Sequence, residues 1–398
     1  MSVHVPAPFL EAAALGLACS FVVALAATRL FAAAPEPPPA QAPLRAEATS
    51  RTLVWNAVVP AAHDVFVSGP RWASGSGPQL SRAVDGSARP FPDAHWNAWA
   101  PGLDAADRFV NLNALRLDAE GALWAVDTGA PGFGGDPLPG GAKLVRMDPA
   151  SGRVLRVIRF GPDAALPGSY IDDVRFQGRR AYLTDAGRPG LIVVDLDRGT
   201  ARRALEGHPS TVARDDRPIV VDGEILRGPD GRPLKVHADP LELSPDGRWL
   251  LYGPLAGPWS RVPLAALDDP ALPAEALAAA VEPFADLPPT GGTAMAPDGR
   301  LVFSDLAADA IRALGPDGRV ETLFADPRLH WVDAMNLDVL GRLWMPAAQI
   351  DRAALFHAGG ARLHLPVTLW SAPLPPAGAT LSRSLPLTDL PLTERSPR

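Results

Sequence analysis

The sequence predicts an all-β fold, a six-bladed β-propeller with four-stranded blades, from three observations. A short unit recurs in which an apolar strand, a tight glycine turn and a second apolar strand follow one another. The turn glycines lie 57, 69, 52 and 42 residues apart, a spacing typical of propeller blades with loop insertions. Asp-Gly and Gly-Gly turns between alternating apolar runs are also the strongest short-range signal of a β-hairpin.

Each blade is expected to begin with one copy of this hairpin. In chain order the six copies lie at 58–72, 115–129, 174–187, 241–255, 295–306 and 336–349. A second hairpin follows most copies and completes a four-stranded blade. These second hairpins are expected at 143–160, 191–205, 310–324 and 354–366. The alanine-rich stretch 273–281 is predicted to be a helical insertion between hairpins. A Rossmann fold is excluded because no glycine-rich loop joins a strand to a helix.

The two ends of the chain differ from this repeating region. An uncharged apolar run from Ala12 to Ala27 is followed by small residues, which predicts an export signal over 1–34. An uncleaved membrane anchor is the alternative, because the run extends through Phe31 to nearly the length of a membrane span. Residues 35–50 are predicted to be a Pro/Ala-rich linker, 51–370 the propeller and 371–398 a loose Pro-rich tail. We therefore expect a secreted or periplasmic protein, attached to a membrane only if the N-terminal segment remains uncleaved.

Composition excludes several classes of function. The chain has 37 basic and 44 acidic residues, a net charge of −7, which argues against a nucleic-acid partner. Its one cysteine, Cys19, lies in the N-terminal apolar run. Disulfides, cysteine-ligated metals and a cysteine nucleophile are therefore excluded from the folded body. The sequence also contains no phosphate-binding loop, nucleophile elbow or HExxH motif.

An ordered series of short segments resembles the major royal jelly and yellow protein family, in a bacterial-type version. The segments lie at 64–72, 123–129, 170–175, 181–187, 190–196, 207–210, 243–247 and 326–331. The resemblance spans roughly Val58 to Asp351. It implies a six-bladed propeller, usually secreted, whose central tunnel binds small molecules such as aromatic amines. Some members of the family are associated with dopachrome conversion.

Polar residues near the start of each first hairpin form the candidate site, because the innermost strands of a propeller converge on one channel. A ring of carboxylates and amides suits either a hard cation such as Ca²⁺ or a cationic amine. Trp331 would supply a stacking wall for an aromatic ligand. The candidate ligand-binding residues are Asn111, Asn113, Asp172, Asp173, His237, Asp239, Trp331 and Asn336. The metal ligands, if a divalent cation is bound, would be Asn113, Asp173, Asp239 and Asp333.

The more distantly similar gluconolactonase-type propellers imply a divalent metal held by a Glu, an Asn and an Asp. Alignment on the turn glycines places Asn113, Asp239 and Gly291 at those positions, so that one carboxylate remains. The royal jelly pattern is also altered, since Thr290-Gly291-Gly292 replaces its usual S-D-G. No cofactor is therefore certain, although Asp173 and Asp333 would compensate for the lost metal ligands.

Three functions follow as alternatives, and whether the protein is an enzyme stays open. The first is a binding protein for a small aromatic or amine ligand. The second is a metal-dependent, gluconolactonase-like hydrolase. The third is a dopachrome-type tautomerase in which His330 and Asp333 transfer protons. The ligand, the oligomeric state and the fate of the N-terminal segment are not determined by the sequence.

Overall fold

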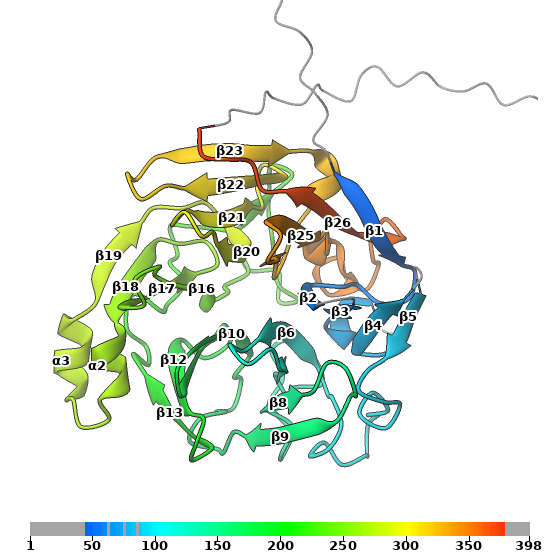
Figure 1. The fold of residues 1–398 in the computed structure, drawn as a ribbon, viewed down its shortest axis with the longest axis horizontal. Coiled ribbons are helices and arrows are strands. Elements are labelled where there is room, and N and C mark those ends of the chain that lie inside the picture. Colours follow the sequence, from blue (N-terminus) through cyan, green and yellow to red (C-terminus); the bar gives the residue numbers. More distant parts are fainter. Residues whose placement is uncertain (1–43, 62–63, 75–76, 85–86, 379–398) are drawn as a thin grey trace, which may run out of the picture. The chain divides into compact units, whose positions relative to one another are not determined.

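The computed structural model describes residues 44–61, 64–74, 77–84 and 87–378, and these form six four-stranded antiparallel sheets around a common axis (Figure 1). This confirms the predicted six-bladed propeller. The first three blades follow the chain in order from the axis outward. Blade 1 contains β2 Ala57–Ala61, β3 Asp64–Ser68, β4 Leu80–Val84 and β5 Ser87–Pro90; blade 2 contains β6 Leu112–Leu117, β7 Leu123–Asp127, β8 Lys143–Met147 and β9 Val154–Arg159; blade 3 contains β10 Ile171–Gln177, β11 Arg180–Asp185, β12 Gly190–Asp195 and β13 Thr200–Ala204.

Blades 4 and 5 follow the same order, whereas blade 6 combines strands from both ends of the described chain. Blade 4 contains β16 Ala238–Leu243, β17 Trp249–Pro254, β18 Trp259–Pro263 and β19 Glu282–Ala285; blade 5 contains β20 Thr290–Met295, β21 Leu301–Asp305, β22 Ala310–Leu314 and β23 Val320–Ala325; blade 6 contains β24 Asn336–Leu337, β25 Arg342–Pro346, β26 Val367–Pro373 and β1 Arg45–Ser50.

The structure of blade 6 differs from two expectations, one about segment 354–366 and one about the boundaries of the propeller. The segment 354–366 is not a hairpin, because η3 Ala354–Phe356 and irregular chain occupy it. Its place is taken by β26 and by β1, which pairs antiparallel with β26 and closes the ring (Figure 1). Residues 45–50, expected in the linker, therefore belong to the propeller, as do 371–373 from the expected tail. A hairpin pattern cannot reveal a strand that pairs with one more than 300 residues away.

The six blades pack face to face, and each of the six interfaces between them contains its own apolar cluster. Phe66 and Leu80 of blade 1 pack with Leu115 and Val145 of blade 2, for example. Similar clusters join the other neighbours around the ring, including blade 6 with blade 1. Sheets covered on both faces favour near-continuous apolar strands, and the first four residues of β7, Leu-Trp-Ala-Val, are apolar and buried. The propeller core is thus a ring of interfaces around a tunnel.

Helices contribute little to the ring. The predicted helical insertion is present as α3 Ala274–Ala279, which follows α2 Leu264–Asp268 between β18 and β19. The remaining short helices are α1 Arg71–Ser74, η1 Pro327–Leu329 and η2 Ile350–Arg352. No helix in the described ranges is both long and apolar enough to cross a bilayer. The export or anchor segment predicted at 1–34 lies outside the described residues.

A long connection between blades 3 and 4 covers one end of the tunnel. It contains a small hairpin of β14 Val220–Val221 and β15 Glu224–Ile225. Its residues Ile219, Leu226 and Val236 belong to an apolar cluster that also includes Tyr170 and Trp331. We refer to residues 205–237 as the cap. The cap places apolar side chains over the N-terminal ends of the innermost strands.

Candidate functional site

β-Bulges in the innermost strands position the predicted polar residues. In an antiparallel pair, a bulge inserts an extra residue and turns a side chain away from its regular direction. The pairing of the first two strands is interrupted in four successive blades at corresponding places. These interruptions lie between Leu112 and Ala114, Ile171 and Val174, Ala238 and Leu241, and Thr290 and Thr293. They contain Asn113, Asp172, Asp173 and Asp239, together with the Gly291-Gly292 pair of blade 5.

Several of these residues meet in one small cavity beneath the cap, with a volume of about 50 Å³. One end of the cavity is polar and the other is aromatic. The polar residues are Asn56, Asn113, Asp172, Asp239 and Asp333, and the aromatic residues are Trp72, Phe133, Tyr170, Trp331 and Phe356. We call this space the axial cavity. The structure therefore brings five predicted residues together, namely Asn113, Asp172, Asp239, Trp331 and Asp333.

Hydrogen bonds fix the polar end of the axial cavity. Asn113 Oδ1 accepts hydrogen bonds from Asn56 Nδ2 at 3.2 Å and from the Tyr170 hydroxyl at 3.0 Å. Its amide nitrogen donates to Asp172 Oδ1. Trp72 Nε1 in turn donates to the Tyr170 hydroxyl at 3.1 Å. The chain of donors runs in one direction, from Trp72 through Tyr170 and Asn113 to the Asp172 carboxylate.

Three carboxyl groups without a cationic partner give the axial cavity its electrostatic character. No ion pair among the described residues involves Asp172, Asp239 or Asp333. Burial raises the pKa of Asp172 well above its usual value, and the carboxyl groups of Asp239 and Asp333 raise it further. Burial and Asp333 likewise raise the pKa of Asp239. Each of the three groups therefore holds its proton to a higher pH than an isolated aspartate does.

The carboxyl group of Asp333 also has a raised pKa. Burial raises its pKa to about 7, although hydrogen bonds to its carboxylate oppose this shift. One of these bonds comes from the Ala334 backbone N–H, which donates to Oδ1 at 2.8 Å. A carboxyl group with this pKa changes charge within the physiological pH range. A cation that enters the cavity would therefore favour the ionised form of Asp333.

Aromatic rings form the other end of the axial cavity. The Phe133 ring lies 5.2 Å from the Trp72 ring and 5.4 Å from the Tyr170 ring, measured between centroids. Phe356 lies 5.9 Å from Trp72, with the two rings nearly perpendicular. Trp72, Phe133 and Phe356 are half-buried, whereas Tyr170 and Trp331 are buried. The aromatic end thus reaches from the protein interior to its surface.

Trp331 is held in a backbone conformation that few large side chains adopt. Its φ angle is +49°, in the left-handed region, which is uncommon for residues other than glycine, asparagine and aspartate. The backbone N–H of Ala348 donates to its carbonyl oxygen at 3.0 Å. Strain of this kind is often retained at functional sites. The strained backbone at Trp331 is consistent with the predicted stacking wall.

Other predicted residues lie elsewhere. Asn111 is buried beside the site, where Nδ2 donates to Thr128 Oγ1 at 3.2 Å and Oδ1 accepts from the Arg71 backbone N–H at 3.0 Å. His237 Nδ1 accepts from the Ala213 backbone N–H at 3.1 Å and so joins two parts of the cap. Asn336 lines a separate cavity at the opposite end of the tunnel. None of these three side chains lines the axial cavity.

His330 is also outside the axial cavity, so it is not placed to act as the predicted proton-transfer group. Its Nδ1 lies 2.9 Å from Asp309 Oδ1, and its Nε2 lies 3.0 Å from Asp351 Oδ1. Burial lowers the pKa of His330, but the two carboxylates outweigh burial and raise it to about 9. The imidazolium therefore joins blade 5 to the segment after β25. Of the predicted pair, Asp333 alone lines the axial cavity.

The structure separates one of the four predicted metal ligands from the others. Asp173 Oδ2 is bound to Arg175 at 2.7 Å and to Arg116 at 3.2 Å, and it does not line the axial cavity. The Asn113 oxygen already accepts two hydrogen bonds. Among the described residues, one group of possible metal ligands has its ligand atoms within 4.8 Å of one another. It consists of Asp222, Asp309 and His330, which do not line the axial cavity. Of the four predicted metal ligands, Asn113, Asp239 and Asp333 line the axial cavity and Asp173 does not.

Sequence reasoning missed Asn56 and most of the aromatic wall. Asn56 immediately precedes the first strand of blade 1, a place similar to that of Asn113 in blade 2, and this parallel was available from the sequence. Phe133 and Phe356 lie in irregular connections. Their approach to the tunnel depends on loop paths that no local pattern predicts.

Comparisons with known proteins agree with this architecture. The model of the family described as major royal jelly protein matches residues 112–355. The chain is similar to the structure of a putative gluconolactonase, with 16% identity over 84% of this chain and 92% of that chain and a TM-score of 0.50. It is also similar to virginiamycin B lyase from Staphylococcus aureus, with 13% identity, coverage of 76% and 81%, and a TM-score of 0.44. For a gluconolactonase from Xanthomonas campestris the identity is 15%, the coverage 85% and 99%, and the TM-score 0.43. A search of curated proteins gave no match.

Proposed function

Because the chain belongs to the major royal jelly protein family, we propose that its axial cavity binds a small aromatic amine. The observation that carries this proposal is the group of three carboxyl residues, Asp172, Asp239 and Asp333, which have no cationic partner among the described residues and face an aromatic wall. A bound ammonium group would neutralise carboxylates that otherwise repel one another. An aromatic ring would stack on the wall.

The size of the axial cavity indicates how such a ligand enters. A volume of about 50 Å³ holds an ammonium group but not a whole aromatic ring. The half-buried rings of Phe133 and Phe356 must therefore move apart as the ligand ring inserts between them. Phe133, Leu234 and Val236 also line a cleft of about 750 Å³ on the outer side. We propose that the ligand passes from this cleft into the axial cavity.

Calorimetric titration with tyramine and with its neutral alcohol analogue tyrosol tests this function. Tyramine should bind saturably at pH 8, whereas tyrosol should bind at least about tenfold more weakly because it has no charge to neutralise the carboxylates. Asp239→Asn should weaken tyramine binding and leave the secondary structure unchanged. Equal affinity for the two compounds, or no binding of any aromatic amine, would contradict the proposal.

The properties of Asp333 favour proton transfer as a second candidate function. A carboxyl group with a pKa of about 7 in a cavity lined by aromatic rings can accept and return a proton at neutral pH. Tautomerisation of a dopachrome-like substrate requires such a group and no metal. Asp333→Asn should then abolish dopachrome conversion, while Asp338→Asn, in a surface turn, should not. An unchanged rate in Asp333→Asn would remove this function.

We also propose that the protein is exported, on the basis of the apolar run Ala12–Ala27. Expression of the full chain followed by N-terminal sequencing distinguishes cleavage near residue 34 from retention of an anchor. Recovery of the intact chain in the cytosolic fraction would contradict export.

A further inference from the structure

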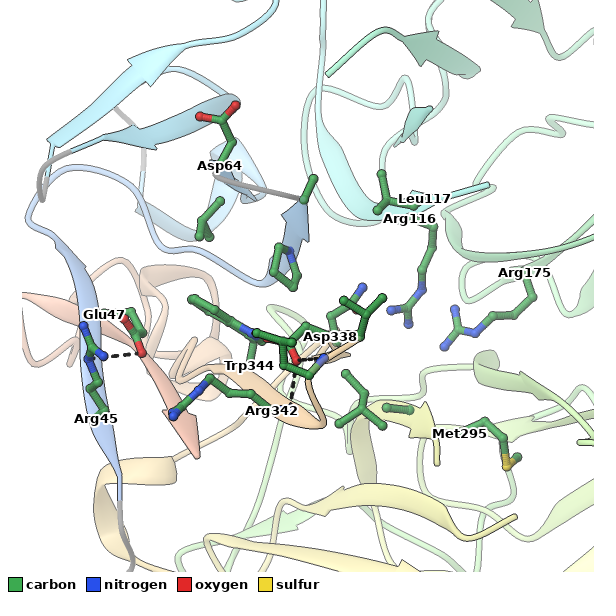
Figure 2. A pocket seen from close by; sticks show the side chains of 18 of the residues that line it. Arg45, Glu47, Asp64, Arg116, Leu117, Arg175, Met295, Asp338, Arg342 and Trp344 are labelled. Atoms are coloured by element: carbon green, nitrogen blue, oxygen red, sulfur yellow. Dashed lines mark hydrogen bonds and ion pairs between the residues drawn. The ribbon is translucent and has the colours of Figure 1, made fainter. Parts of the chain in front are cut away.

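A second cavity, of about 700 Å³, lies at the opposite end of the tunnel from the axial cavity (Figure 2). It is lined by residues at the C-terminal ends of the innermost strands, including Leu117 of β6, Arg175 of β10 and Met295 of β20. We call it the distal cavity. Its size falls within the range of small-molecule binding sites.

Charged side chains in the middle of the tunnel separate the two cavities. Arg175 bonds to Asp173 Oδ2 at 2.7 Å and to Glu242 Oε1 at 2.6 Å. Its Nη2 also donates to Thr293 Oγ1 at 3.0 Å. Arg116 bonds to the same Asp173 oxygen at 3.2 Å. A ligand of the distal cavity therefore meets this network and not the carboxyl groups of the axial cavity.

Arg116 has hydrogen-bonding capacity that the protein does not use. A guanidinium group carries five N–H donors. Nη1 donates to the Met335 carbonyl oxygen at 2.9 Å and Nη2 to Asp173, whereas the buried Nε has no partner. The Arg116 side chain is only 10% exposed, and Figure 2 shows it directed into the cavity beside Arg175. A buried guanidinium with free donors is stabilised by an oxygen acceptor, and most strongly by a carboxylate.

The acidic residues that line the distal cavity already have partners. Glu242 accepts from Arg175 and from the Thr293 hydroxyl. Asp338 accepts from the backbone N–H groups of Leu340 and Arg342 at 2.9 Å. Arg342, in contrast, has no carboxylate partner among the described ion pairs, and its Nη1 donates to a serine hydroxyl at 2.9 Å. Among the charged groups that line the cavity, the guanidinium groups of Arg116 and Arg342 therefore have hydrogen-bond donors that the protein leaves unused.

The wall and rim of the distal cavity are apolar. Leu117, Met295 and Trp344 lie around the cavity in Figure 2. At the tip of the turn between β24 and β25, Val339 and Leu340 are 102% and 89% exposed. Two adjacent exposed apolar side chains offer surface that a hydrocarbon chain would cover favourably. Both residues line the cavity.

From these observations we propose that the distal cavity binds an amphipathic carboxylate, with the carboxylate at Arg116 and the hydrocarbon chain against Leu117, Met295 and Leu340. The guanidinium group of Arg116 requires a negatively charged head group beside it. The apolar rim requires a hydrocarbon tail. This inference does not depend on the proposed amine function.

Calorimetric titration of the full chain with hexanoate, octanoate and decanoate, each below its micellar concentration, tests the proposal. Affinity should increase about fourfold for each added methylene until the chain outgrows the cavity. Decanol should bind at least about tenfold more weakly than decanoate, because it does not form a charge-assisted bond with Arg116. Saturation with tyramine should not compete with decanoate.

Two variants separate the head-group and tail contributions. Arg116→Lys keeps the charge but loses the planar set of donors, and should weaken decanoate binding at least about tenfold. Leu340→Ser alters an exposed side chain that does not support the fold, and should weaken decanoate binding while leaving hexanoate nearly unchanged. Val320→Ser, at an exposed apolar position of β23, is the matched control and should have no effect.

Several results would overturn the proposal. These are no saturable binding of any of the three carboxylates, equal affinity for decanol and decanoate, unchanged binding in both Arg116→Lys and Leu340→Ser, or competition by tyramine. If Arg116→Lys does not fold, the Leu340→Ser and decanol comparisons still decide the question.

Discussion

Asp172 and Asp173 are neighbours in the chain, yet their carboxyl groups face different parts of the tunnel. Asp172 lines the axial cavity and accepts a hydrogen bond from Asn113. Asp173 turns toward the middle of the tunnel and binds Arg116 and Arg175. The pKa values move in opposite directions as a result. Burial raises that of Asp172, whereas the two arginines outweigh burial and lower that of Asp173. The bulge in β10 therefore places two adjacent carboxyl groups in different surroundings. Asp172 has a raised pKa, whereas Asp173 has a lowered pKa.

Amine binding should depend on pH through Asp333. Its pKa of about 7 means that it is mostly protonated at pH 6 and mostly ionised at pH 8. If the ammonium ligand binds only the ionised form, affinity rises about tenfold between these two pH values. Calorimetry with tyramine across this range measures the change. Asp333→Asn should give a flat profile, and an equally steep profile in that variant would assign the dependence to another group.

Asp333 should also reduce stability at high pH. Its pKa is about 7 in the folded protein and near 4 when unfolded, so the folded state binds more protons between these values. Stability therefore falls as pH rises from 4 to 7, by up to about 4 kcal/mol for this group alone. Asp333→Asn should raise the free energy of unfolding at pH 8 and change it little at pH 4. Denaturant unfolding at both pH values measures this, and destabilisation at pH 8 would be the contrary result.

His330 should contribute stability that disappears in alkaline solution. Its pKa is raised from 6.5 to about 9, so the contribution is complete below pH 6.5 and is lost as pH rises through 9. The magnitude is about 3 kcal/mol at most. His330→Gln should lower the unfolding free energy at pH 6 and remove this loss between pH 7 and pH 10. His364→Gln, an exposed histidine, is the control, and identical pH profiles for both variants would refute the role of His330.

Lys143 and Asp127 form a fully buried ion pair in blade 2 whose disruption should be costly. The Lys143 Nζ lies 2.8 Å from Asp127 Oδ2, and neither side chain is exposed. Nζ also donates to the carbonyl oxygens of Ala105 and Gly141. Lys143→Met leaves a buried carboxylate without its counter-charge and should destabilise the fold by about 3–5 kcal/mol. Thermal unfolding measures the loss, and the half-exposed Lys235→Met should be nearly neutral. Comparable melting temperatures for the two variants would show that the pair contributes little.

The sequence was sufficient for the parts of this structure that depend on local patterns. Alternating apolar runs around turns such as Gly121 and Gly299 located the first hairpin of every blade. Strand starts were enough to predict that Asn113, Asp172 and Asp239 lie close together, because radial symmetry makes equivalent positions converge. The direction of Asp173 could not be predicted, since a bulge decides which of two adjacent carboxylates faces the cavity. The partners of His330 come from Asp309 and Asp351, and their approach depends on how blades 5 and 6 pack.

The pairing of β1 with β26 has a consequence for synthesis of the chain. The ribosome synthesises Arg45–Ser50 long before Val367–Pro373. The first segment therefore has no pairing partner while the strands of the first five blades are synthesised. The ring can therefore close only after β26 has been synthesised, and until then β1 has no strand to pair with. Premature termination anywhere before residue 373 would leave an open arc whose two edges are free to join other molecules.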